Sequence, residues 1–128
     1  MSDVNVYIAA PFDRKTFVRE VFHILSAKGY GASLRWLQAP DCGATPQQLH
    51  GEAIVDLQDI DKCDLFVLCN DNIHLSTTGG MHNETGYALH AGKKCIILGR
   101  RAPGNPFHML MDVYERPEDI PEPSALGF

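Results

Sequence analysis

Two acidic residues have the setting that acid–base chemistry on a leaving group requires. Glu84 follows a polar, glycine-bearing stretch at 76–83 and precedes an apolar helix face, and Asp56 lies between the core-type residues Val55 and Leu57. A carboxylate nucleophile near a second carboxyl group suits cleavage of a glycosidic bond, because the transition state is oxocarbenium-like. The alternatives are that Glu84 is a favourable charge in the first turn of a helix starting near Met81 or His82, and that Asp56 is a solvated helix acid.

The stretch before Glu84 is a second candidate for ligand contact. Gly79 and Gly80 precede a predicted helix, where backbone N–H groups can meet a ligand. Their pattern is neither the dinucleotide-binding nor the Walker fingerprint, so a plain turn explains it equally well. The hydroxyls of Ser76, Thr77 and Thr78 suit a phosphate or a sugar, although such residues are also common in loops.

The histidines and cysteines predict neither a metal site nor a cofactor. Six histidines include no HxxxH pair, and four cysteines include no CxxC pair. His82, two residues before Glu84, and His108, in a predicted loop, remain candidates for contact with a ligand. Cys69 and Cys95 lie in apolar runs and are expected to be buried thiols, which suits a reducing cytoplasm.

Strands and helices alternate along the chain. Apolar runs predict strands over 4–10, 32–37, 64–70, 93–99 and, as a short edge strand, 111–115. Helical periodicity predicts helices over about 16–29, 47–62 and 82–92. This order predicts an α/β domain with a doubly wound parallel sheet of about five strands and helices on both faces. Ligands of such sheets bind beyond the carboxyl ends of the strands, here 9–14, 70–80 and 99–108.

Local patterns specify how these helices are expected to begin and pack. Asp13 is placed to cap the first helix, whose predicted apolar face contains Phe17, Val21, Ile24 and Leu25. The second helix is expected to bury a stripe formed by Leu49, Ala53, Leu57 and Ile60.

Composition excludes several functional classes. The 128 residues suit one domain over 1–128, with a Pro-rich tail at about 116–128 that Ile120 or Phe128 could anchor. The net charge of −5 and the scattered basic residues argue against a nucleic-acid polymer or an anionic membrane surface as partner. No signal-peptide pattern and no apolar run of about 18 residues is found, so a membrane span is not expected.

Three segments together resemble the nucleoside 2-deoxyribosyltransferase family. They are VYIAAPF at 6–12, DLQDIDKCDLFVL at 56–68 and GGMHNETGYALHAGKKCIIL at 79–98. The likeness covers roughly residues 4–110, and its most specific part is ETGYAL at 84–89. The resemblance implies a flavodoxin-like or Rossmann-like fold and an enzyme that cuts the bond between a base and ribose or deoxyribose. Members include transferases of nucleotide salvage and nucleoside 5′-monophosphate N-glycoside hydrolases.

The resemblance also implies roles for individual residues. Glu84 matches the nucleophile that holds a covalent glycosyl intermediate. Asp56 matches the acid that assists departure of the base, and Tyr7 matches a residue that positions the nucleophile. Ala9 to Phe12 match part of the base pocket. Residues 105–110 match a stretch that reaches the neighbouring subunit's site, so His108 would act in trans in a homodimer or larger assembly.

The loop before Glu84 departs from the transferases. They carry another acid six residues before the nucleophile, where this chain has Thr78. The family's hydrolases hold a 5′-phosphate with a small Ser/Gly loop, a role open to Ser76, Thr77, Gly79 and Gly80, with Arg14 or Lys15. The sequence does not decide which base and sugar the substrate contains, or whether the reaction is transfer or hydrolysis. A rival hypothesis also stays open, namely that the chain is a module of the same fold that binds a nucleotide or an NAD-derived signal without turnover.

Overall fold

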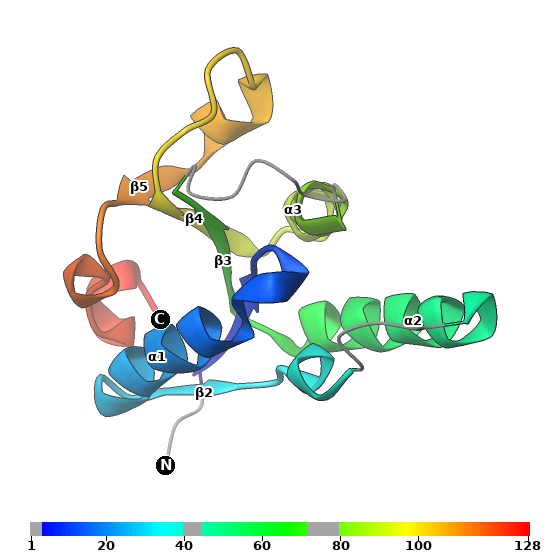
Figure 1. Cartoon of the computed structure of the whole chain (residues 1–128). Helices are drawn as coiled ribbons and strands as arrows, with labels where there is room; N and C mark the ends of the chain where they lie inside the picture. The colour runs from blue at the N-terminus through cyan, green and yellow to red at the C-terminus, as the bar shows by residue number, and fades with distance from the viewer. Residues whose placement is uncertain (1–3, 40–44, 72–79) are drawn as a thin grey trace.

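The computed structural model describes residues 4–39, 45–71 and 80–128, and Figure 1 shows one sheet with helices packed against both faces. The strands are β1 (Val4–Ala9), β2 (Tyr30–Ala32), β3 (Leu65–Asn70), β4 (Lys94–Gly99) and β5 (Asp112–Tyr114). All pairings are parallel, and the spatial order is β2-β1-β3-β4-β5. This is the flavodoxin-like order, which confirms the predicted doubly wound α/β fold.

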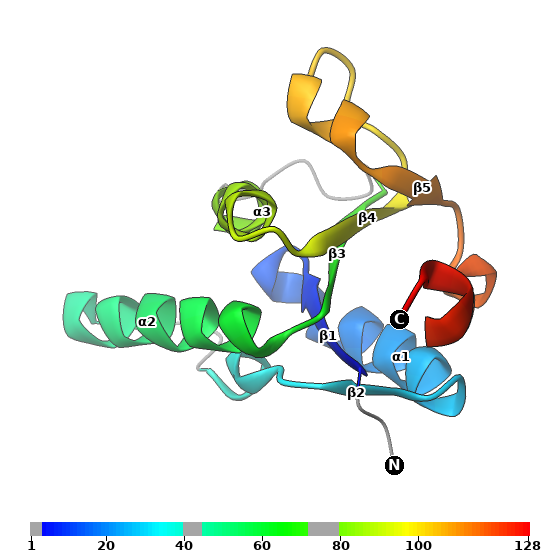
Figure 2. The same cartoon turned by 180° about the vertical axis from the view of Figure 1, so that it is seen from behind.

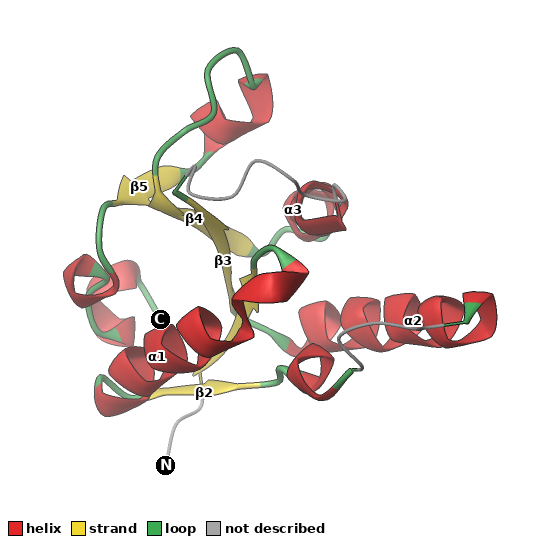
Figure 3. Ribbon diagram, viewed as in Figure 1, coloured by secondary structure: helices red, strands yellow, loops and turns green. Residues whose placement is uncertain are grey.

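The three long helices divide between the two faces of the sheet. They are α1 (Lys15–Ala27), α2 (Pro46–Lys62) and α3 (Gly80–His90). Figures 2 and 3 show α1 and the C-terminal segment on one face, with α2 and α3 on the other. The chain passes from β1 to β2 on one side and then crosses to β3 on the other, so the strand order reverses between β1 and β3. The carboxyl ends of these two strands mark the place where such folds bind ligands.

The core follows the apolar runs of the central strands. All six residues of β3 are buried, as are four residues each of β1 and β4. A parallel strand covered on both faces needs apolar residues at successive positions, which is why these runs show no alternation. Cys69 and Cys95 are buried free thiols, as predicted.

The prediction of a strand over 32–37 was wrong. The second strand covers only Tyr30–Ala32, and the chain then forms the 3₁₀ helix η2 (Arg35–Gln38). Trp36 Nε1 donates to Ile8 O at 3.1 Å, and the backbone N–H of Arg35 donates to Asp59 Oδ2 at 3.1 Å. These two bonds turn the segment toward β1 and α2, where an extended strand could not make both.

The predicted details of two helices were also wrong. A 3₁₀ turn, η1 (Phe12–Arg14), precedes α1, so the N-cap is Arg14 and not Asp13. In α2 only Ile60 of the predicted stripe is buried, whereas Leu49 and Leu57 are 57% and 39% exposed and Ala53 is exposed as well. The N-terminal turns of α2 extend beyond the sheet (Figure 1), so the stripe has no sheet to cover there. The inward face carries Asp59 and Ile60.

The C-terminal segment is anchored against α1. Ile120 is fully buried, whereas Phe128 is 43% exposed, so Ile120 is the anchor. Tyr30 Oη donates to Pro121 O at 2.7 Å, and Lys28 Nζ donates to the carbonyls of Glu118 and Ile120. Among the described residues, no helix has both the length and the apolar character needed to cross a bilayer.

Candidate active site

Tyr7 and Glu84 meet at the reversal point of the sheet. The Tyr7 hydroxyl donates to Glu84 Oε2 at 2.7 Å. Tyr7 lies on β1 with no exposed surface, and its ring stacks on Phe66 of β3 with centroids 5.7 Å apart and planes 11° from parallel. Burial, together with the charges of Glu84 and Asp56, raises the pKa of Tyr7, so its hydroxyl is a fixed neutral donor.

Glu84 and Asp56 form a hydrogen-bonded carboxyl pair. Burial raises the pKa of Glu84 to about 8; the Tyr7 hydrogen bond acts against this rise, and the Asp56 charge adds to it. Burial also raises the pKa of Asp56 to about 6, while its hydrogen bond with Glu84 lowers it. Two adjacent, partly buried carboxyls cannot both ionise readily, so the pair shares one proton near neutral pH.

The helix that carries Glu84 begins earlier than predicted. Within the described residues α3 starts at Gly80, so Glu84 lies beyond its first turn. The simple placement of a charge at a helix N-terminus therefore does not explain this acid. Thr85 Oγ1 donates to Met81 O at 2.7 Å, and both residues are buried. The bond lies within α3 itself, and the Tyr7–Glu84 hydrogen bond ties this part of the helix to β1.

The inward face of α2 supplies two acids with different partners. Asp59 is 1% exposed and is neutralised by Arg35, whose Nε and Nη2 lie 2.9 and 2.8 Å from its Oδ1. Asp56, three residues earlier, meets Glu84 instead. Its Oδ1 is buried and has no hydrogen-bond partner among the residues that the structure describes. The first acid ties η2 to α2, and the second is left available for a ligand.

A groove lies between η2 and α2, and Asp56 is among the residues that line it. Its cavity volume is about 430 Å³, which lies within the range of small-molecule sites. One wall contains Trp36, whose indole N–H is already bonded to Ile8 O. The α2 wall presents Glu52, Val55 and Asp56. The groove thus places an aromatic side chain and Asp56, one member of the carboxyl pair, on the same cavity.

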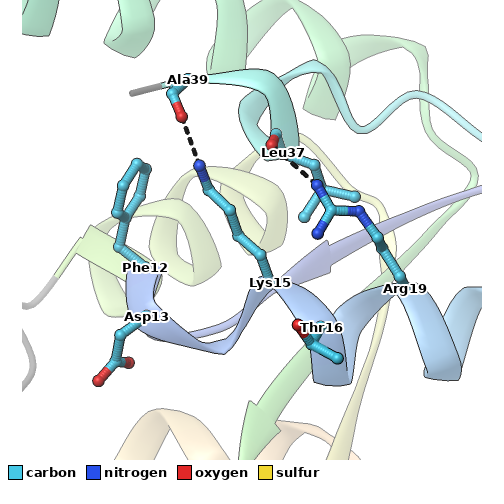
Figure 4. A pocket seen from close by; sticks show the side chains of 7 residues that line it. All are labelled: Phe12, Asp13, Lys15, Thr16, Arg19, Leu37 and Ala39. Carbon is cyan, nitrogen blue, oxygen red and sulfur yellow. Dashed lines mark hydrogen bonds between the residues drawn. The ribbon is translucent and has the colours of Figure 1, made fainter. Parts of the chain in front are cut away.

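A second cavity, of about 570 Å³, lies between η2 and the start of α1, and Figure 4 shows its lining. Lys15 Nζ donates to Ala39 O, and Arg19 Nη2 donates to Leu37 O at 3.3 Å. The Phe12 ring lies 6.1 Å from that of Trp36, centroid to centroid, so it stands between this cavity and the groove. Ala39 lines both spaces.

The other candidates at the strand ends occupy distinct positions. Ala9 ends β1 and is buried, and Phe12 is 37% exposed. Arg14 pairs with Asp71 just after β3, and its guanidinium lies 3.9 Å from the centre of the Phe17 ring. A cation is therefore held where β1 and β3 end.

His82 and His108 come together within one chain. Their ring centroids are 5.9 Å apart. His108 is 1% exposed, its Nδ1 accepts the N–H of Ala102 at 2.9 Å, and burial followed by the nearby His82 and Arg101 lowers its pKa. The ring is therefore neutral with a proton on Nε2, an atom that has no partner among the described residues.

Some predicted site residues lie outside the described residues, and some neighbours of the site were not predicted. Ser76, Thr78 and Gly79 fall in 72–79, so only Gly80 of the loop is placed, at the exposed start of α3. Glu52, Trp36 and the Arg35–Asp59 pair were missed. Glu52 and Asp59 lie four residues before and three after Asp56, a spacing that indicates a shared helix face. Among the described residues no cluster of three or more His, Cys, Asp or Glu side chains suits a metal ion.

Solved structures provide the comparison. No protein-family model and no curated protein gives a significant match to the sequence. The 2-deoxyribosyltransferase of Bacillus psychrosaccharolyticus matches with a TM-score of 0.74 and 15% identity, over 91% of this chain and 89% of that one. The CMP N-glycosidase BcmB of Clostridium botulinum matches with a TM-score of 0.59 and 23% identity, over 90% of this chain and 92% of that one.

A third structure extends the same group. The 2-deoxyribosyltransferase of Leishmania mexicana matches with a TM-score of 0.56 and 15% identity, over 77% of this chain and 65% of that one. These proteins are of the kinds that the sequence motifs resemble. The chain has the fold of 2-deoxyribosyltransferases and of a CMP N-glycosidase.

Proposed function

We propose that the protein is an enzyme that cleaves the N-glycosidic bond of a (deoxy)nucleoside or its 5′-monophosphate. Glu84 attacks C1′, the bond from C1′ to the base nitrogen breaks, and a glycosyl ester forms on Glu84. Water then gives hydrolysis, or a second base gives transfer. The single observation that carries this proposal is the partly buried Glu84–Asp56 pair with Tyr7 bonded to Glu84.

The shared proton suits both chemical roles. The nucleophile must be ionised when it attacks, whereas the group that assists the base must hold a proton to give. When the proton of the pair resides on Asp56, Glu84 is an anion and Asp56 is an acid. The electrons of the breaking bond pass to the base nitrogen, and the Asp56 proton neutralises them. Tyr7 holds Glu84 in place throughout, because its hydroxyl stays protonated.

The direct test is release of free base. The protein is incubated with a panel of nucleosides and 5′-monophosphates, in ribo and deoxy forms, with and without an acceptor base, and products are separated by chromatography. We expect release from at least one substrate and a fall of roughly 10⁴-fold or more in Glu84→Gln. The charge-matched control Glu20→Gln, on the exposed side of α1, should retain the wild-type rate.

The same panel includes the outcomes that contradict the proposal. No base release from any substrate, or an unchanged rate in Glu84→Ala, would reject it. Thermal stabilisation by a nucleotide without any product would instead favour the binding module, since a ligand that binds only the native state raises apparent stability.

We further propose a cytoplasmic homodimer or larger homo-oligomer in which residues 105–110 complete the neighbouring site. The 3₁₀ helix η3 (Pro106–Leu110) exposes three apolar side chains, Phe107, Met109 and Leu110, at 61%, 70% and 69%. His108 is buried in its own chain, so these three are the ones available to a partner. Light scattering should report an oligomer that Met109→Asp weakens; a monomeric wild type would reject this arrangement.

A further inference from the structure

Glu52 is a carboxylate at the groove that the bond-cleaving steps do not use. It lines the groove four residues before Asp56, about 6 Å along the axis of α2. Its Oε2 atom is buried and has no hydrogen-bond partner among the described residues. A buried acceptor without a donor is costly, so a ligand that supplies a hydrogen there would be stabilised.

The strong donors of the groove are already committed. The guanidinium of Arg35 bonds to Asp59 and, at 3.3 Å, to Gln58 Oε1. The indole N–H of Trp36 bonds to Ile8 O. Within the described lining, the acidic oxygens of Glu52 and Asp56 are the buried polar atoms that still lack a partner. The groove therefore favours a flat ligand that carries a hydrogen-bond donor.

The position of Glu52 relative to the carboxyl pair indicates which part of a substrate it meets. With the sugar at Glu84 and the leaving nitrogen at Asp56, the base extends along α2 past Trp36. Glu52 then faces the edge of the base that is remote from the sugar. In cytosine and adenine that edge carries an exocyclic amino group, and in uracil and hypoxanthine it carries a carbonyl oxygen.

We propose that Glu52 is a specificity-determining residue that accepts a hydrogen bond from the exocyclic amino group of the base. This inference rests on the proposed function. A carboxylate has acceptors only, so it binds an amino group and repels a carbonyl oxygen at the same place. The enzyme should therefore prefer cytosine or adenine over the deaminated counterpart of the same ring.

The test compares matched substrates that differ at this group. The kcat/KM for base release is measured for deoxycytidine and deoxyuridine 5′-monophosphates and for the adenine and hypoxanthine pair. We expect the wild type to prefer the amino base by roughly 10- to 100-fold, the effect of one hydrogen bond to a charged group. Glu52→Gln, whose amide can donate to a carbonyl, should reduce this ratio at least tenfold, and Glu20→Gln should not change it.

A binding arm separates this inference from the proposed function. Affinities for the same pairs are measured by calorimetry with Glu84→Gln, which cannot form the glycosyl ester, and with Glu52→Gln added to it. If the wild type releases base and Glu52→Gln leaves the preference for the amino base unchanged, the role of Glu52 is overturned and the proposed function stays intact. If the wild type releases no base, preferential binding of the amino base that Glu52→Gln abolishes still supports the role of Glu52. Equal binding of the amino base and its deaminated counterpart overturns it.

Discussion

Asp56 and Asp59 lie three residues apart on α2, and both turn toward the protein, yet their surroundings differ. Asp59 is almost fully buried, and it accepts hydrogen bonds from both the side chain and the backbone N–H of Arg35. Asp56 lies beside another acid, Glu84, and keeps one buried oxygen without a partner among the described residues. One acid is neutralised and the other is not.

This difference in surroundings separates a structural role for Asp59 from the catalytic role that we propose for Asp56. A buried carboxylate with a cation and several donors is satisfied, so it fastens one element to another. A partly buried carboxyl beside a second carboxyl is not satisfied in this way, and groups with such shifted pKa values gather at functional sites. The same helix therefore contributes to the fold through Asp59 and, as we propose, to the reaction through Asp56.

The largest effect is expected where the proposed chemistry lies. Asp56→Asn removes a proton that the leaving base needs, so kcat for base release should fall by roughly 10²- to 10⁴-fold. The free energy of unfolding at neutral pH should stay the same or rise, because repulsion with Glu84 is removed. Kinetics and urea unfolding check both expectations. Asp61→Asn, an exposed acid on the same helix, should keep kcat within about twofold of wild type, and an equal loss there would remove the contrast.

The opposite effect is expected at the ion pair. Arg35→Met leaves Asp59 buried without its cation, so the free energy of unfolding should fall. Urea unfolding measures this loss. The matched control is Arg19→Met, whose side chain makes one exposed bond at 3.3 Å and should cost less than about 1 kcal/mol. Equal costs for the two variants would show that Asp59 does not depend on its partner.

The carboxyl pair should make stability depend on pH. The folded-state pKa values, about 8 for Glu84 and about 6 for Asp56, lie above the ordinary values of 4.5 and 3.8. The folded protein therefore binds protons more tightly than the unfolded chain. This stabilisation is fully present below about pH 4, and it is lost as pH rises from there through 6 and up to 8. Relative to Glu84→Gln, the wild type should lose on the order of a few kcal/mol across that window. Urea unfolding at several pH values tests this, and parallel curves would contradict it.

A smaller effect is expected from the hydroxyl that holds Glu84. Tyr7→Phe removes a hydrogen bond that lowers the pKa of Glu84. The rising limb of kcat/KM against pH, which reports ionisation of Glu84, should move up by about one unit, and kcat should fall by roughly tenfold. A lower kcat with an unmoved pH profile would indicate that Tyr7 acts only through packing.

Much of the fold could be predicted because its strands are buried on both faces. Continuous apolar runs specified β1, β3 and β4, and their alternation with helices specified the doubly wound sheet. The segment 32–37 was mistaken for a strand, because its apolar residues serve contacts of Trp36 and Arg35 with distant elements. The buried face of α2 was predicted only in part: Ile60 is buried, but apolar spacing also favoured Leu49 and Leu57, whereas the fold turns Asp59 inward.

The candidate site was predicted less completely. Glu84 and Asp56 were candidates from their positions in the sequence, the resemblance added Tyr7, and the structure brings the three together. Glu52 was missed because a glutamate on a polar helix gives no local signal that one of its oxygens is buried. The position of Glu84 within α3 also depends on where the helix begins, which helical periodicity predicts only to within a few residues.

The central claim is that Glu84 becomes bonded to the sugar, and a trapped intermediate tests it most directly. A 2′-fluoro substrate slows breakdown of the glycosyl ester, because fluorine destabilises the oxocarbenium-like transition state. After incubation, intact-protein mass spectrometry and peptide mapping should show one sugar bonded to Glu84 and one equivalent of free base, with no adduct in Glu84→Gln. Base release with the sugar bonded to another residue, or with no adduct at all, would contradict this account.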